Sequence, residues 1–561
     1  MDANEAMSSL GDPWRKPWQM LMYFLIRIPS EVIPSWQMMA IIFIGAEPKH
    51  RCRLPDAVSP SEAIPYRKVS GERIYDSCVV YENYSSATNR KVPCPLGWEY
   101  EQDSYTITEQ WDLVCSDNYG SESTQMFLVI GVIVGSLTVM PIADKFGRKR
   151  TFLISACAGN LVLFVTAWVN NYYVFIALRL LVGVFLQGTM MPAYVLSCEL
   201  FPARQRTMAG VILMQVWSVS LVVLAGLAYF VRNWRHLLII TSFPGVFMIP
   251  LFWIIPESVP WLIANNRLEE AKQILHKAAR WNKVELPQKY RPATTAAPLT
   301  RVSAAENEQN CPLMTKEEGP VSVETTTQYT MVDLFRSRRL TVNLLVMFYL
   351  WFVICLVYYG LSLTSGTLAG NKYLNVCLSG AIEIPAYITC AIVLKYLGRR
   401  WPMFVFFSIA GLSLLATLVI PQTTASGTDL SVLIVTLNMV GKFGITATFG
   451  GIFLYTTEIF PTTIRNIAFG LASAGGRMGS LASPYSTYFL RVAPWFPGVV
   501  FGTMAIIAAT LTLLLPETLG RALPQTIEEV ENWNGRKERP HMEITVTVVG
   551  KVEKEKIPGK I

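Results

Sequence analysis

The chain has 561 residues, of which 52% are hydrophobic and only 16% are charged, and its mean hydropathy is +0.35. Soluble domains carry roughly 25% charged residues, so this composition excludes an ordinary soluble protein and indicates an integral protein of the lipid bilayer. The net charge of +8 comes from lysine and arginine gathered in particular short loops. That pattern is typical of cytoplasmic loops, and we expect no nucleic acid among the partners.

About twelve apolar runs are long enough to cross the hydrocarbon layer as helices. The first, residues 20–44, contains Arg27 and Glu31, four positions apart on one helix face, where they either neutralise each other or face a solute. The later expected spans are residues 123–143, 151–169, 172–196, 208–231, 236–255, 341–363, 374–394, 403–420, 430–455, 467–490 and 497–515. Residues 1–19 and 516–561 are expected to be cytoplasmic ends.

A long polar segment, residues 45–122, separates the first two spans. It holds four cysteines and the only Asn-x-Ser/Thr sequence of the chain, which begins at Asn83. Disulfides and N-glycans both belong to the extracytoplasmic side, so we expect a glycosylated, disulfide-bonded extracellular loop. Its four cysteines allow three pairings, among which the sequence does not choose. They are Cys52, Cys78, Cys94 and Cys115.

The loop after residues 123–143 is short and basic, which places it in the cytoplasm. Asp144 and Arg148 within it can act as a conformational latch, meaning an ion pair that differs between states. The alternative is a plain positive anchor for the membrane border. Arg179, inside the span 172–196, is buried by position and needs an acidic partner or a polar cavity.

Residues 256–340 are hydrophilic and contain no spanning run, so we expect a cytoplasmic linker between two six-helix halves, residues 20–255 and 341–515. Residues 267–277 have helical spacing. Residues 294–327 are rich in Thr, Ala and Glu and are expected to be flexible.

Three short sequences occur twice, about 255 residues apart, which predicts duplicated helix bundles with a solute site between them. Glu199-Leu-Phe-Pro with Arg206 recurs as Glu458-Ile-Phe-Pro with Arg465, Phe146-Gly-Arg-Lys149 as Leu397-Gly-Arg-Arg400, and Pro256-Glu-Ser258 as Pro516-Glu-Thr518. The first pair of sequences stands where apolar runs end. Its Glu199, Arg206, Glu458 and Arg465 are therefore further candidate latch residues, and Arg179 joins this gating set.

Several stretches together identify a family. They are His50-Arg-Cys-Arg-Leu-Pro-Asp-Ala57, Trp111-Asp-Leu-Val-Cys115, Asp144-Lys-Phe-Gly-Arg-Lys149, Pro256-Glu-Ser258 with Trp261-Leu262, Tyr358-Tyr-Gly-Leu-Ser-Leu363, Glu383-Ile-Pro-Ala-Tyr387 and residues 458–466. The chain resembles the organic cation, organic anion and carnitine transporters (solute carrier family 22) of the major facilitator superfamily over nearly its whole length.

This resemblance implies an all-α major facilitator fold with two pseudo-symmetric halves, alternating access, and a place in the plasma membrane with both termini in the cytoplasm. The chain departs from the family pattern at Met140, where the family has Gly, and at Val259-Pro260, where it has Pro-Arg. Both departures lie in elements associated with gating.

A solute held inside the bilayer needs polar partners, which makes intramembrane charges and aromatics the candidates. Trp351 and Tyr358 are seven residues apart on one helix face, and Glu383 lies in the next span. Aromatic rings attract a quaternary ammonium by about 0.5–2 kcal/mol, and Glu383 adds a negative charge. The resemblance places all three in the family's cavity, whereas the residues alone favour ordinary aromatic packing.

Arg477 stands where, by the same resemblance, the anion and carnitine transporters have Arg and the cation transporters have Asp. A guanidinium flanked by small residues can hold a carboxylate bidentately. Lys442 adds a second positive charge, and Gln187 replaces a Lys of the cation transporters while Tyr194 is retained. The alternative is an ion pair between Arg477 and Glu383 that neutralises both.

These charges suit a zwitterion such as carnitine, or a related organic cation, as the small solute. An organic anion exchanger is the alternative substrate class, and a solute sensor or receptor that does not transport is the alternative of another class. We expect no enzyme, no metal and no cofactor, because the four histidines lack metal-binding spacing and no phosphate-binding loop is present. Sodium symport, exchange and uniport driven by membrane potential all occur among transporters that resemble this one.

Overall fold

The computed structural model is almost entirely helical. It describes residues 7, 9–56, 58–69, 72–84, 90–101, 104–201, 206–287, 333–421, 429–521, 524–525 and 527–531. The predicted flexible stretch, residues 294–327, and the end of the tail, residues 532–561, lie outside these described residues.

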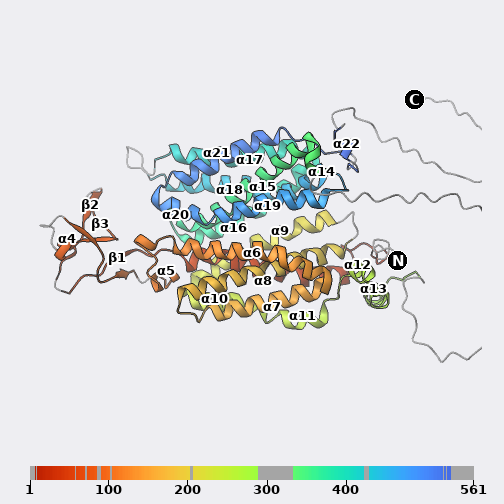
Figure 1. The fold of residues 1–561 in the computed structure, drawn as a ribbon, viewed down its shortest axis with the longest axis horizontal. Coiled ribbons are helices and arrows are strands. Elements are labelled where there is room, and N and C mark those ends of the chain that lie inside the picture. The colour runs from red at the N-terminus through yellow and green to blue at the C-terminus, as the bar shows by residue number, and fades with distance from the viewer. Residues whose placement is uncertain are drawn as a thin grey trace, which may run out of the picture.

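Two helix bundles lie side by side, one from each half of the sequence (Figure 1). The first contains α2 (Pro17–Met39), α3 (Ile41–Ile44), α6 (Gly120–Phe146), α7 (Arg148–Thr166), α8 (Tyr172–Glu199), α9 (Arg206–Phe230), α10 (Trp234–Ser242), η5 (Phe243–Gly245) and α11 (Met248–Ile254). The second contains α15 (Arg338–Thr364), η7 (Ser365–Thr367), α16 (Lys372–Leu397), α17 (Arg400–Val419), α18 (Ser431–Ile459), α19 (Arg465–Ala482), α20 (Tyr485–Val492) and α21 (Phe496–Thr512).

Every span expected from the sequence coincides with one of these helices or with a short series of them. In the described part of the chain, 7 helices are both long and apolar enough to cross a membrane, and two more apolar helices, Met214–Phe230 and Phe496–Thr512, are shorter. The first span is α2 followed by α3, with Pro29 and Pro34 inside α2. The predicted all-α membrane fold is confirmed.

Short helices cover the end of each bundle that we call the inner end. They are α12 (Val259–Ala264) and α13 (Leu268–Asn282) in the first half, and α14 (Asp333–Arg336) and α22 (Ile527–Glu531) in the second. The helix predicted from residues 267–277 is thus confirmed as α13. Asn282 at its end accepts a hydrogen bond from the Trp18 backbone N–H (3.2 Å) and donates one to Gln19 Oε1 (2.8 Å), which fixes α13 beneath α2.

The extracellular loop forms a small module that projects from the opposite, outer end of the bundles (Figure 1). Its strands make three antiparallel pairs, β1 (His50–Cys52) with β6 (Trp98–Tyr100), β2 (Tyr66–Val69) with β3 (Glu72–Tyr75), and β4 (Val79–Tyr81) with β5 (Lys91–Pro93). Short helices connect them, α4 (Pro60–Ala63), η1 (Glu82–Tyr84), α5 (Ile107–Gln110) and η3 (Cys115–Asp117).

Two disulfides stabilise the module, Cys52–Cys94 and Cys78–Cys115, which is one of the three pairings that the sequence allows. The buried hydrophobic core beside them is small and, in the described part of the module, consists of Ala63, Ile64 and Val80 besides Cys52. Such a core is too small to hold the module without covalent help. Tyr100 at its base donates a hydrogen bond to Asp112 (2.9 Å), and burial together with this bond raises the pKa of the Tyr100 phenol.

The tightest helix contact of the first half, between α6 and α8, depends on glycine. A Cβ atom at Gly183 would overlap the carbonyl oxygen of Leu128, and one at Gly131 would overlap that of Leu180. Helices inside a membrane gain stability from such close backbone approach, because lipid supplies no hydrophobic drive between them.

We therefore expect Gly183→Val to force α6 and α8 apart and to destabilise the protein by about 1–3 kcal/mol or more. The matched control is Gly226→Val on α9, because a Cβ at Gly226 would meet no atom within 4 Å. Fluorescence-detected size-exclusion chromatography of detergent extracts measures both. Equal monodisperse yields of the two variants would contradict the proposed role of Gly183.

Candidate functional site

A buried ion pair lies in the core of the second half. Lys442 Nζ on α18 is 3.0 Å from Glu383 Oε1 on α16, and the two side chains are 2% and 0% exposed. The same ammonium donates to the Tyr358 carbonyl oxygen (3.2 Å) and to Ser362 Oγ. An ammonium has three donors, so Lys442 is fully satisfied by the protein. The partner of Glu383 is thus Lys442, and the Arg477–Glu383 pair weighed from the sequence does not form.

Glu383 also connects the two halves. Ser218 Oγ on α9 of the first half donates to Glu383 Oε2 at 3.0 Å, and Ser218 is fully buried. The carboxylate therefore has a cation on one side and a hydroxyl from the opposite bundle on the other. This is a polar contact between the halves far from either end of α16.

Arg477 on α19 has a different environment. It lies close to Tyr359 and Cys355 of α15, and its neighbours Gly475 and Gly479 allow α19 to approach the α15 backbone. Within the described residues, Arg477 makes no hydrogen bond and no ion pair. It therefore stands as a half-buried guanidinium without a protein counter-ion.

The two aromatics singled out in the sequence are both buried. Trp351 donates from Nε1 to Thr456 Oγ1 (3.1 Å) and packs edge-on against Phe453 with ring centroids 4.7 Å apart. The Tyr358 ring already carries a cation, because Lys442 Nζ lies 3.5 Å from its centroid.

Tyr359 was not among the site residues predicted from the sequence. This half-buried ring packs against the hydrophobic clusters of both halves, and it lies in the electrostatic range of Arg477, Glu383 and Glu31. Its neighbour Tyr358 drew attention by heptad spacing to Trp351, and the phase of α15 turns Tyr359 instead toward the junction. The Tyr358-Tyr359 pair itself was the available signal.

In the first half, Arg27 and Glu31 form an intrahelical ion pair, which confirms that they neutralise each other. The Arg27 guanidinium also lies over the Tyr194 ring, 5.5 Å from its centroid. Gln187 lies elsewhere: it is buried where α8 packs on α6, with its Cβ 2.9 Å from the position that a Cβ of Gly135 would take. The structure therefore brings Tyr194, but not Gln187, next to the charged residues of α2.

Arg179 is completely buried, and its partners are neutral. It donates to the Gln37 carbonyl oxygen (3.3 Å) and to Gln125 Oε1 (3.0 Å). The expected acidic partner is thus absent among the described residues, and amide oxygens accept from two of the three guanidinium nitrogens instead, while Nε has no hydrogen-bond partner there. Arg179 lies near the outer end of α8, whereas Glu199, which belongs to the same predicted gating set, is the last residue of this helix at the inner end.

At the inner end, the repeated sequence motifs pair with each other. The carboxylate of Glu257 accepts from the Lys149 backbone N–H (3.0 Å), and that of Glu517 accepts from the Arg399 and Arg400 N–H groups (2.8 and 3.0 Å). Each carboxylate thus caps a helix N-terminus, where the helix dipole favours negative charge. The adjacent Gly147 and Gly398 have φ of 104° and 90°, and a Cβ at either would overlap the capping carboxylate.

The candidate latch residues have the following partners. Arg148, the first residue of α7, pairs across the Gly147 turn with Asp144 at the end of α6 (3.0 Å). Glu458 pairs with Arg399 (2.8 Å) and not with Arg465, which donates to the Phe460 carbonyl oxygen (3.2 Å). Glu199 ends α8. Helix α9 begins at Arg206, whose side chain lies outside the described part of the chain.

The departures Met140 and Val259-Pro260 are compatible with these elements. Met140 continues α6, and Pro260 stands in the first turn of α12, where a missing N–H costs nothing. Ser258 caps that helix by accepting from the Trp261 N–H (3.1 Å), and Trp261 Nε1 donates to the Asp144 carbonyl oxygen (2.7 Å). The substituted segment therefore still holds the end of α6.

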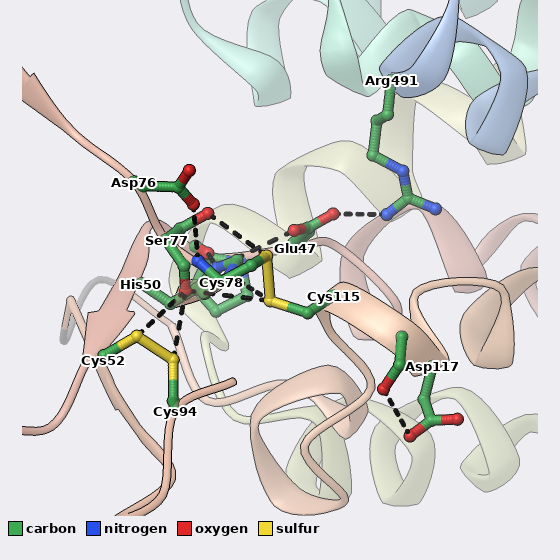
Figure 2. Close-up of a disulfide and its surroundings, with 12 residues drawn as sticks. Glu47, His50, Cys52, Asp76, Ser77, Cys78, Cys94, Cys115, Asp117 and Arg491 are labelled. Carbon is green, nitrogen blue, oxygen red and sulfur yellow. Dashed lines mark hydrogen bonds and ion pairs between the residues drawn. A yellow bond between two sulfur atoms is a disulfide. The ribbon is translucent and has the colours of Figure 1, made fainter. Parts of the chain in front are cut away.

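A second charged cluster, at the outer end, was not foreseen. Arg491 on α20 binds Glu47 of the module (Figure 2). It also binds Glu122 of α6. Arg491 lies just beyond the expected span 467–490, so the sequence predicted a loop at this position. Nearby, His50 lies within reach of the sulfurs of Cys78 and Cys115, but the disulfide between these cysteines leaves no thiolate for a metal.

Comparison with known proteins agrees with this architecture. The family model "Sugar (and other) transporter" matches residues 82–530. The human organic cation/carnitine transporter 2 is 32% identical over 96% of this chain and 95% of its own length, and a Drosophila melanogaster organic cation transporter protein is 32% identical over 96% of both chains. A mouse relative, solute carrier family 22 member 21, is also 32% identical over 96% of this chain.

The chain belongs to the solute carrier 22 family. It is a transporter of the major facilitator superfamily and not an enzyme. The inward open structure of the xylose transporter XylE from E. coli shares the fold, with a TM-score of 0.55, 14% identity, and coverage of 92% of this chain and all of that one. The solute carrier 22 resemblance found in the sequence motifs is thereby confirmed.

The Glu383–Lys442 pair generates a stability prediction for this solute carrier 22 protein. We expect Glu383→Gln and Lys442→Met each to destabilise it by about 3–5 kcal/mol, because each leaves one buried charge unpaired. The double variant leaves none and should be less destabilised than either single variant. Thermal unfolding of the purified chain in one detergent measures all three. Additive losses would show that the two charges are not paired.

Proposed function

We propose that this transporter carries small quaternary-ammonium zwitterions of the carnitine type across the plasma membrane by alternating access. The observation that carries the proposal is the unpaired guanidinium of Arg477. The buried charges of Lys442 and Glu383 cancel, as do those of Arg27 and Glu31. Arg179 and Arg477 keep an uncompensated positive charge among the described residues, and only Arg477 also lacks hydrogen bonds there. A solute carboxylate is the natural counter-ion of Arg477, because Arg binds carboxylates bidentately.

The ammonium end of the solute has matching chemistry close by. Glu383 and the Tyr358 ring already hold one ammonium, that of Lys442, in an aromatic and anionic environment. Tyr359 lies within electrostatic range of Arg477, Glu31 and Glu383, and its ring can receive a trimethylammonium group by cation–π attraction. The name of the human relative, organic cation/carnitine transporter 2, supports the same substrate class.

An organic anion exchanger is the second candidate, and the same unpaired Arg477 favours it. If the Lys442 ammonium leaves Glu383 in another state, two cations would face the solute and an ammonium on the solute would be superfluous. A non-transporting sensor on this fold would bind the solute without moving it. Flux of carnitine, of a carboxylated aromatic anion, or of neither separates the three.

For the mechanism, the two halves rock about the junction that contains Glu383 and Ser218. The inner-end ion pairs, Asp144 with Arg148 and Glu458 with Arg399, exchange partners as the inner ends separate and approach. Glu199, Arg206 and Arg465 belong to the same inner-end set by their repeated motifs. Coupling to sodium or to membrane potential supplies the driving force.

We expect Arg477→Asp to abolish saturable carnitine uptake, and Arg477→Lys to weaken apparent affinity, because an ammonium keeps the charge but loses the bidentate geometry. Loss of a buried charge partner costs about 2 kcal/mol or more, which is roughly a 30-fold loss. Uptake of labelled carnitine into cells expressing each variant at equal surface level, with and without sodium, measures this. Arg267→Gln is the control, because this partly exposed side chain just before α13 forms its ion pair with Glu270 on the surface of the inner end.

Full carnitine uptake by Arg477→Asp would remove Arg477 from the site. Uptake of a carboxylated aromatic anion, with no carnitine uptake by the unmodified chain, would move the protein to the anion branch. Saturable binding without any flux would favour the sensor.

The proposed orientation places the module outside the cell and both termini in the cytoplasm. Asn83 is exposed on the module, so we expect it to carry an N-glycan. Asn83→Gln should then migrate faster in gel electrophoresis and match the glycosidase-treated protein. Unchanged migration of Asn83→Gln would mean that the residue is not modified.

A further inference from the structure

A partly open cavity of about 690 Å³ lies at the outer end and is lined by three parts of the chain. The module contributes Glu47, Lys49 and His50, the first half contributes Ile41, Ile42 and Glu122, and the second half contributes Leu363, Lys372 and Arg491. The wall of this cavity therefore contains apolar side chains as well as side chains of both positive and negative charge. Its volume is in the range of pockets that hold small organic ligands.

Arg491 joins all three parts. Its guanidinium lies 2.5 Å from Glu47 Oε2, contacts Glu122 Oε1, and donates to the Asn118 carbonyl oxygen (3.0 Å). Glu122 is only 5% exposed and also accepts from Thr487 Oγ1 of the second half (2.8 Å). We call Arg491, Glu47 and Glu122 the outer clamp, because their bonds hold the outer ends of the two halves together.

The module fixes one arm of the outer clamp. Glu47 lies 3.8 Å from His50 Nδ1, and the other side of the His50 ring faces the Cys78–Cys115 disulfide, with Nε2 3.9 Å from Cys115 Sγ (Figure 2). Glu47 is thus placed by a cross-linked segment and not by a free loop. The geometry around Arg491 is preorganised from the module side.

The outer clamp is made of the interactions that a zwitterion can replace. A solute carboxylate is chemically equivalent to the side chains of Glu47 and Glu122 and can take their place on Arg491. The glutamates released from Arg491 then face the solute ammonium, while Ile41, Ile42 and Leu363 offer apolar contact to its methyl groups. A carboxylate without an ammonium would leave both glutamates unpaired at a cost.

We propose that the outer cavity is a second solute site, specific for small carboxylate-bearing zwitterions, and that Arg491 is its switch. Arg491 keeps the outer ends closed through Glu47 and Glu122 and releases them when a solute carboxylate displaces these residues. The preference for zwitterions rests on the proposed function, whereas the role of Arg491 in closing the outer end does not.

Closure can be measured at a native thiol. Cys377, near the outer end of α16, is half-buried and packs against a hydrophobic cluster that contains residues of both halves. In intact cells, a membrane-impermeant maleimide should label Cys377 about tenfold faster or more in Arg491→Gln than in the unmodified chain, because the clamp bonds are lost. Arg491→Lys should be intermediate, and Cys377→Ser identifies the labelled residue. Equal rates in the unmodified chain and Arg491→Gln would overturn the clamp.

Solute capture is measured by binding of labelled carnitine to the purified full chain in lipid nanodiscs. With the inner site disabled by Arg477→Ala, we expect weak residual binding that the double variant Arg477→Ala/Arg491→Gln loses and Arg477→Ala/Arg267→Gln retains. Where the unmodified chain binds carnitine, absence of residual binding in Arg477→Ala, or its persistence in the Arg491→Gln background, would overturn the outer site.

The two proposals fail in different ways. If the unmodified chain binds no carnitine, the proposed substrate is wrong, and the test of the outer site passes to maleimide labelling with acetate, betaine or tetraethylammonium added outside. Betaine, which has a carboxylate and an ammonium, should accelerate Cys377 labelling in the unmodified chain and not in Arg491→Gln. Acceleration by tetraethylammonium alone, or by none of the three, would overturn capture through Arg491.

Discussion

A charge inside the hydrocarbon layer must be paired, hydrogen-bonded or in contact with water, and this constraint organises the structure. Arg27 is neutralised by Glu31 on its own helix and Lys442 by Glu383 on a neighbouring helix, whereas Arg179 keeps its charge and is hydrogen-bonded by amide oxygens. Arg477 is the exception, with no protein partner among the described residues. The proposed substrate class follows from the missing partner of Arg477, because a transported carboxylate can supply it.

The spans and the disulfide-bonded extracellular module could be predicted from the sequence because each depends on local properties. Hydropathy over about 20 residues marks a span, and clustered cysteines mark an oxidised loop. Helix α13 followed from its spacing alone. The same sequence could not give the partner of Glu383, since Lys442 lies on a helix two spans away and only the packing of α16 against α18 brings them together.

Three further features were beyond sequence reasoning for the same reason. The disulfide pairing depends on how short strands fold over one another. The sequence pointed to Tyr358, whereas Tyr359 lies at the junction of the two halves. Which of the two rings faces the junction depends on the rotation of α15 about its axis, and a spacing of seven residues does not determine that rotation. Arg491 stands at the end of a helix, where it looked like loop, and only the approach of the module and α6 reveals its partners.

The duplicated motifs show that internal repetition conserves contacts and not only sequences. In each half, a glycine in the left-handed region lets the backbone turn, and a glutamate from a distant motif caps the next helix. In each half, the capping glutamate and the helix start that it caps belong to the same bundle, so these hydrogen bonds connect elements within one bundle at the inner end. The inner ends can therefore move as rigid units with their caps intact.

Glu383 binds Lys442 within its own half and Ser218 across the junction. Any ligand that interacts with the Glu383 carboxylate also changes the free energy of the contact between the halves. Thermodynamic linkage then requires the reverse: whatever shifts the halves, whether lipid composition or an antibody to one state, must alter solute affinity by the same factor. Binding of a ligand to Glu383 and the relative position of the two halves are therefore thermodynamically coupled, because both depend on the same carboxylate.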